Sequence, residues 1–145
     1  MSSHRIPVAA LALVLFVGPM GSQCTKSPPE LNITDAWMRP LLDNGAAFMV
    51  INNTGGRTDQ LIGVQCNCAK TVTVHETRMD GNIMRMAAVG RLLIPGYAST
   101  ELSPTGHHIM LEGIDRNIAD GSSVKLILQF ERSGSMEVMA EVRKL

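Results

Sequence analysis

The chain has 145 residues, 45% of them hydrophobic, and its 13 basic residues balance its 13 acidic ones. This length is enough for one domain with a buried core, and a second domain is not needed to account for it. No cluster of Lys or Arg offers the basic surface that a nucleic-acid backbone requires. With one Trp, one Tyr and three Phe, stacking platforms for bases are also not expected. We therefore expect no nucleic-acid partner.

Residues 1–24 are predicted to be a signal peptide or a lipoprotein signal. The apolar run Ile6–Val17 is too short to cross a bilayer comfortably and has the length of a signal-peptide core. The first cysteine after it, Cys24, is a candidate lipid-attachment site, although Gln23 precedes it where bacterial lipoproteins usually carry a small residue. Ordinary cleavage near this point is the alternative. The predicted protein is exported, periplasmic or otherwise extracytoplasmic, and contacts the membrane only through a possible lipid anchor.

Residues 25–30 include Pro28 and Pro29 and are predicted to be a short tether, and residues 31–145 are predicted to be one β domain. In this domain short apolar or β-branched runs alternate with Gly, Asn, Asp and Pro, and no stretch keeps a helical period over three turns. The predicted strands are Asn32–Met38, Ala47–Asn52, Asp59–Val64, Thr71–Thr77, Ile83–Val89, Ser99–Leu102, His108–Leu111, Val124–Glu131 and Glu137–Val142. Eight or nine short strands indicate an all-β Greek-key sandwich or small barrel.

Four residues in this domain form a candidate metal site. His75, Met86, His108 and Met110 have the spacing His-x10-Met-x21-His-x-Met. Two imidazoles and two thioethers are soft, neutral donors, which suit Cu(I) better than Ca²⁺, Mg²⁺ or a thiolate-based zinc site. The pattern therefore indicates copper binding.

A hairpin at Asp80-Gly81 gives the first two ligands a predicted geometry. With these two residues as the turn, a symmetric register places His75 opposite Met86 and Glu76 opposite Arg85. His108 and Met110 are two residues apart on a predicted strand and therefore share one face. Whether the two pairs meet depends on the fold.

Three further residues are candidate auxiliary contacts. Met84 lies beside the proposed ligands in the sequence. Cys66 and Cys68 precede the His75 strand and could form a disulfide, bind Cu(I) as thiolates, or have only a structural role. Each ligand candidate taken alone would more often be a packing or surface residue.

In combination these motifs resemble the PCuAC family of periplasmic copper chaperones. The four-residue spacing matches the family signature without insertion or deletion. Further similarity lies in Asp35-Ala36-Trp37-Met38-Arg39-Pro40, Asn53-Thr54-Gly55-Gly56, Val74-His75-Glu76-Thr77, Met79-Asp80-Gly81 and His107-His108-Ile109-Met110-Leu111, within roughly Ile33 to Val142.

The resemblance implies a cupredoxin-like fold that binds Cu(I) at a partly exposed site. It also implies that His75, Met86, His108 and Met110 are the ligands. The implied partner is a copper-receiving protein, such as cytochrome c oxidase subunit II, which carries the binuclear copper centre, or a second copper chaperone. Transfer, and not enzymatic turnover, is the implied activity.

Three other functions compete with this hypothesis. A blue-copper electron carrier would have a similar fold but needs a Cys ligand closely followed by His and Met, and Cys68 lies seven positions before His75. A thiol-disulfide oxidoreductase would have Cys-x-x-Cys at a helix start. A metal-free interaction domain would make the ligand spacing accidental. No Ser-His-Asp set, carboxylate pair or phosphate loop supports an enzyme.

Overall fold

The computed structural model describes residues 25–144, and within them all regular structure is β-strand. The ten strands are β1 (Leu31–Leu41), β2 (Asn44–Asn53), β3 (Asp59–Gln65), β4 (Thr71–Asp80), β5 (Ile83–Ala88), β6 (Leu92–Ile94), β7 (Ala98–Leu102), β8 (His107–Glu112), β9 (Ser123–Phe130) and β10 (Gly134–Val142). The all-β prediction is confirmed. The three-residue strand β6 was missed, so there are ten strands where eight or nine were predicted.

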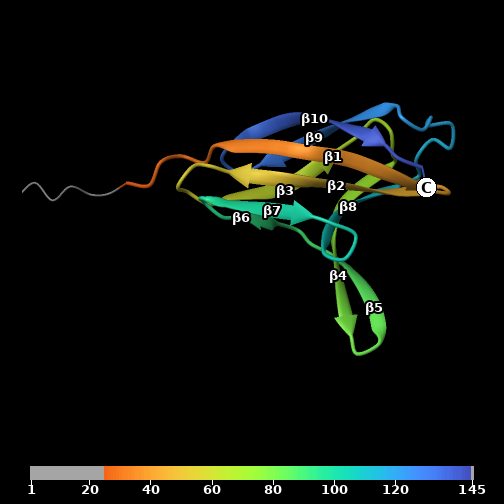
Figure 1. The fold of residues 1–145 in the computed structure, drawn as a ribbon, viewed down its shortest axis with the longest axis horizontal. Coiled ribbons are helices and arrows are strands. Elements are labelled where there is room, and N and C mark those ends of the chain that lie inside the picture. The colour runs from red at the N-terminus through yellow and green to blue at the C-terminus, as the bar shows by residue number, and fades with distance from the viewer. Residues whose placement is uncertain (1–24, 145) are drawn as a thin grey trace, which may run out of the picture.

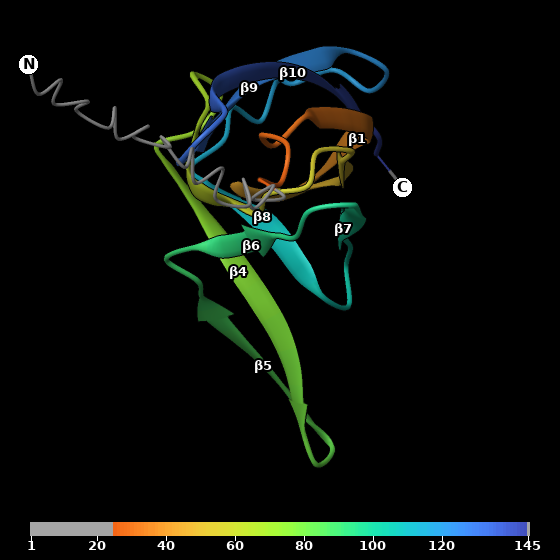
Figure 2. The ribbon, with the colours of Figure 1, turned by 90° about the vertical axis from the view of Figure 1, so that its left-hand side faces the viewer.

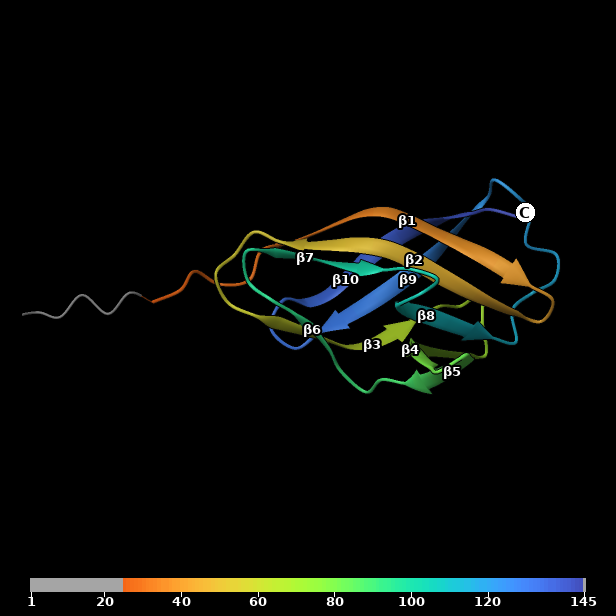
Figure 3. The same ribbon diagram turned by 60° about the horizontal axis from the view of Figure 1, so that its bottom comes forward.

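The strands form one curled sheet in the order β5-β4-β8-β7-β2-β1-β10-β9-β3-β6 (Figures 1 and 3). Neighbours are antiparallel except for the parallel pairs β1–β10 and β7–β8. Strand β8 also pairs with β2, so it is bonded to both β2 and β4. The curl brings β3 beside β4 and encloses the core.

The core is formed by alternate residues of the strands, as expected when one face of each strand packs inward. On β9 the buried residues are Val124, Leu126, Leu128 and Phe130. On β8, Ile109 and Leu111 are fully buried on the core face. Because side chains alternate along a strand, the remaining positions of β8 are free to point away from this core.

The β4–β5 hairpin departs from this pattern and extends away from the curled body (Figure 2). Val74 of β4 is still buried against the core, but all six residues of β5 are exposed. The turn residues are Gly81 and Asn82, and Gly81 has φ +61°. A glycine in this conformation at the first turn position is typical of a type II′ hairpin turn.

The predicted register of this hairpin is wrong. Asp80 pairs with Ile83, so the turn lies one residue later than predicted. His75 is therefore opposite Ala88, and Met86 is opposite Thr77. Compared with the prediction, the partner of each β4 residue is shifted by two positions along β5. A shift of two keeps every side chain on its predicted face of the hairpin and changes only the residue opposite it.

The predicted Glu76–Arg85 pair is replaced by two others. Arg78 forms an ion pair with Glu76 at 2.6 Å, and Arg85 forms one with Asp80 at 3.0 Å.

The predicted signal segment, residues 1–24 with Cys24, lies outside the described residues. In the predicted tether, the Ser27 carbonyl accepts a hydrogen bond from the Arg57 amide, and the Glu30 carbonyl accepts one from the Thr54 amide. Among residues 25–144 there is no helix with the length and hydropathy needed to span a bilayer.

Candidate metal centre

The pairing of β4 with β8 brings the two histidines together. His75 is directly opposite His108, and their ring centroids are 6.0 Å apart. Two positions away on the same face, Thr73 is opposite Met110. Three of the four predicted ligands therefore share one face of two neighbouring strands. This face is opposite the one on which Val74 and Ile109 enter the core.

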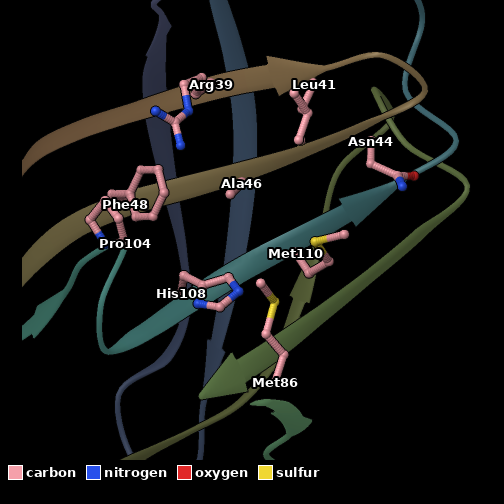
Figure 4. Close-up of a pocket in the computed structure, with 10 residues that line it drawn as sticks. Arg39, Leu41, Asn44, Ala46, Phe48, Met86, Pro104, His108 and Met110 are labelled. Carbon is pink, nitrogen blue, oxygen red and sulfur yellow. The ribbon is translucent and has the colours of Figure 1, made fainter. Parts of the chain in front are cut away.

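Met86 reaches the same region from β5, on the far side of β4. Figure 4 shows its side chain directed toward His108 and Met110, so that its thioether end is the part nearest to them. These three residues line one cavity of about 170 Å³, together with residues of β1, β2 and the β7–β8 turn. The residues completing the wall are Arg39, Leu41, Asn44, Gly45, Ala46, Phe48 and Pro104. His75 is beside His108 on the adjoining strand but does not line this cavity.

The cavity is protected on one side and open on the other. His108 is 4% exposed, whereas Met86 is 59% exposed. Behind His108 lies an aromatic series in which the Phe48 ring is 6.4 Å from His108 and the Trp37 ring is 4.5 Å from Phe48. The Arg143 guanidinium lies 5.5 Å from the centroid of Trp37. An ion at His108 would thus be shielded by the body and accessible from the hairpin.

Each imidazole forms a hydrogen bond through one of its ring nitrogens. The Gly106 carbonyl can only accept, so the contact of 3.3 Å from His108 Nδ1 requires Nδ1–H and leaves the lone pair on Nε2. His75 Nε2 lies 2.9 Å from Thr73 Oγ1. If the Thr73 oxygen accepts, Nδ1 of His75 carries the free lone pair. Such support from non-ligand groups is a usual feature of metal-binding histidines.

Charged groups near the site are already engaged with each other. The carboxylate of Glu76 accepts a hydrogen bond from Arg78, which lowers the pKa of Glu76. The other Glu76 oxygen lies 4.0 Å from His107 Nε2. Within residues 25–144 there is no group of three or more His, Cys, Asp or Glu side chains suited to a metal ion. The other candidate donors beside the two histidines are the thioethers of Met86 and Met110, and thioethers favour a soft ion.

The auxiliary candidates lie outside this cavity. Met84 is opposite Met79 near the hairpin turn, on the same face as Met86. Cys66 and Cys68 both lie in the loop that connects β3 to β4, where they form a disulfide with each other. They line a separate cavity of about 180 Å³ with Val124, Lys125 and Ile127. As a disulfide, these sulfurs are not thiolate donors.

Three residues at the site were not identified from the sequence. Thr73 contacts His75, and Phe48 forms part of the wall behind His108. Thr77, opposite Met86, has a buried hydroxyl with no hydrogen-bond partner. The alternation of Thr73, His75 and Thr77 on one strand was a visible signal, because residues two apart share a face. Nothing comparable indicated Phe48, which comes from another strand.

Comparison with known proteins finds related sequences. The model of a family described as "Putative lipoprotein LpqE-like" matches residues 31–142. A relative from Leifsonia xyli subsp. xyli, named "Putative lipoprotein Lxx21020", is 27% identical over 81% of this chain and 72% of its own length.

Solved structures share this fold, and among them are PCuAC domains. The copper-bound PCuAC domain of PmoF2 aligns with a TM-score of 0.69 at 23% identity, over 83% of this chain and 99% of that domain. The CuI form of DR1885 from Deinococcus radiodurans aligns with a TM-score of 0.59 at 26% identity, over 86% of this chain and 83% of that protein. The cupredoxin-like fold and the resemblance to PCuAC proteins are confirmed.

Proposed function

We propose, from the premise that this chain belongs to the LpqE-like family, that it is a copper chaperone which binds Cu(I) through His75, Met86, His108 and Met110. The observation that carries the proposal is the β4–β8 register, in which His75 faces His108 with Met110 on the same face. Met86 lines the same cavity from the hairpin. The copper-bound PmoF2 domain and the CuI form of DR1885, which share this fold, support the choice of ion.

The donor set accounts for the choice of Cu(I). Thioether sulfur is a soft, neutral ligand that favours Cu(I), and the two imidazoles add neutral nitrogen donors. Nδ1–H of His108 donates to the Gly106 carbonyl, which holds the ring with Nε2 available to an ion. Because both imidazoles must be unprotonated to bind, affinity should fall in acid.

The open side of the site supports transfer in preference to permanent storage. With Met86 largely exposed, a partner could approach that side and replace one ligand while the buried His108 still holds the ion. We propose that the acceptor is a copper-receiving protein, such as cytochrome c oxidase subunit II or a second chaperone. The proposed location is extracytoplasmic, with Cys24 as the point of lipid attachment.

A blue-copper electron carrier is the alternative that shares this fold. It would require a cysteine thiolate at the ion, and the cavity lined by His108 contains no cysteine. The oxidised copper form should therefore lack the intense blue band of a copper–thiolate bond.

X-ray absorption of the Cu(I) form tests the ligand set. Wild type should show a mixed nitrogen and sulfur shell; Met86→Ala should lose sulfur scattering and His108→Ala nitrogen scattering. Met139→Ala is a matched control, because Met139 is 58% exposed but lies on β10 opposite Lys125. Identical shells in wild type, Met86→Ala and His108→Ala would refute the proposed site.

A further inference from the structure

The hairpin that carries Met86 presents two more methionines on the same face. Met79 of β4 is directly opposite Met84 of β5, and the next pair on that face toward the body is Thr77 with Met86. Directly opposed residues have Cβ atoms about 4.5–5.5 Å apart, and residues two apart on a strand are separated by about 7 Å. Three flexible thioethers can therefore converge outside the cavity.

Packing does not account for these methionines. Met79, Met84 and Met86 are 63%, 56% and 59% exposed, and the hairpin has no core beneath its outer half. Exposed strand positions usually hold β-branched or polar residues, which fit a pleated surface better than an unbranched thioether. An apolar side chain left in water also gains nothing from burial.

The two faces of the hairpin differ sharply in chemistry. Arg78, Asp80 and Arg85 alternate with the methionines and so project from the opposite face, where Arg85 forms an ion pair with Asp80. Arg78 forms an ion pair with Glu76 on the same side. From Thr77 to Met86 the methionine face carries no charged side chain, and its oxygen donor is the Thr77 hydroxyl, while the charges on the other face are paired among themselves. The three thioethers outnumber that oxygen, so this face favours a soft monovalent cation.

We propose that Met79, Met84 and Met86 form an outer Cu(I) site from which the ion passes to the inner site at His75, His108 and Met110. This inference rests on the proposed function and adds an entry route to it. Met86 belongs to both sites: it keeps its Cu(I)–sulfur bond while Met79 and Met84 are exchanged for the ligands of β4 and β8. The oxidation state of copper does not change, and no proton transfer is needed at sulfur.

The outer site is tested first with the inner site disabled. In a His75→Ala, His108→Ala, Met110→Ala variant with ¹³C-labelled methionine methyl groups, Ag(I), a redox-inert substitute for Cu(I), should shift the resonances of Met79, Met84 and Met86. Adding Met79→Leu and Met84→Leu should abolish binding, whereas adding Met139→Leu should not. Methyl resonances of Met79 and Met84 that stay unmoved by Ag(I) would overturn the proposal.

The route is tested with the inner site intact. Transfer of Cu(I) from a chelator complex to the Met79→Leu, Met84→Leu protein should be about tenfold slower than to wild type, because the entry site has gone; a change of this size lies within the range over which association rates of related variants differ. The equilibrium affinity should change less than about threefold, since the inner ligands remain. An unchanged transfer rate would refute the route alone, whereas a wild-type protein that takes up no Cu(I) would refute the proposed function itself.

Discussion

The curled body and the β4–β5 hairpin differ in how far their side chains are buried. In the body, strands such as β8 and β9 bury every second residue in a shared core, whereas every residue of β5 is exposed. His108 and Met110 belong to the body, and Met86 belongs to the hairpin. The site therefore joins a firmly held half to a weakly supported half. This division suits the carrier function that we propose, because the proposed ligand on the weakly supported side could be released to a partner while the other side retains the ion.

The largest expected difference between the two regions is in stability. Leu126 of β9 is fully buried, so Leu126→Ala should lower the free energy of unfolding by roughly 2–5 kcal/mol through lost burial and a residual cavity. Met84→Ala on the hairpin should change it by less than about 0.5 kcal/mol, because Met84 is exposed. Urea denaturation measures both. An equal cost for the two variants would mean that the hairpin is part of the same cooperative core.

Asp59, a buried carboxylate, provides the next largest test of the body. Burial alone would raise the pKa of Asp59, but hydrogen bonds from the Ser133 hydroxyl and from the backbone amides of Arg132, Gln60 and Ser133 outweigh it and lower that pKa. Asp59→Ala should cost about 2–3 kcal/mol, because these buried donors lose their acceptor.

The same carboxylate predicts a pH dependence with a definite sign. Its pKa is lower in the folded than in the unfolded protein, so its stabilisation is complete above the unfolded value and is lost as the pH falls through the folded value. Thermal unfolding followed from pH 7 to pH 3 should show wild type losing stability below about pH 4. Asp59→Asn, which does not ionise, should lose less over this range. Parallel curves for the two proteins would contradict the prediction.

Strand-level features could be predicted from the sequence because they depend on local patterns. Alternating residues in β9 and the shared face of His108 and Met110 follow from the two-residue period of a strand. The hairpin register could not be fixed in the same way. Asp-Gly and Gly-Asn are both acceptable two-residue turns, and only the structure shows that Gly81 takes the positive φ at the first position.

Contacts between strands far apart in the chain could not be predicted from spacing at all. That β4 lies beside β8, and so His75 beside His108, depends on how the whole sheet curls. The contact of Phe48 with His108 and the pairing of β6 with β3 could not be predicted for the same reason. Each of them joins residues on strands that are distant in the sequence.

Thr73 lies on β4, the strand that pairs with both the body and the rest of the hairpin. Its substitution is expected to change Cu(I) affinity and not the free energy of unfolding. Thr73→Val removes the hydroxyl that contacts His75 Nε2, which should free the ring to rotate and weaken Cu(I) affinity by about tenfold. Thr71→Val is the matched control, because Thr71 has the same side chain two residues earlier on β4 and pairs with Glu112. Competition against a Cu(I) chelator measures both. Equal affinities for the two variants would show that the hydroxyl does not position the imidazole.

The smallest expected effect is on the local stability of the hairpin alone. Gly81 has φ +61°, and beyond its two chain neighbours no heavy atom lies within 4 Å of the position that a Cβ would take, so Gly81→Ala adds backbone strain without a clash with the rest of the protein. The cost should be about 1 kcal/mol and should fall on the hairpin, because the core lies elsewhere. Hydrogen exchange should become faster in β5 but not in β9, while Asn82→Ala, at the other turn position, should leave both nearly unchanged. If exchange in β9 rose equally, the hairpin would not open independently, and Met86 would be held as firmly as His108.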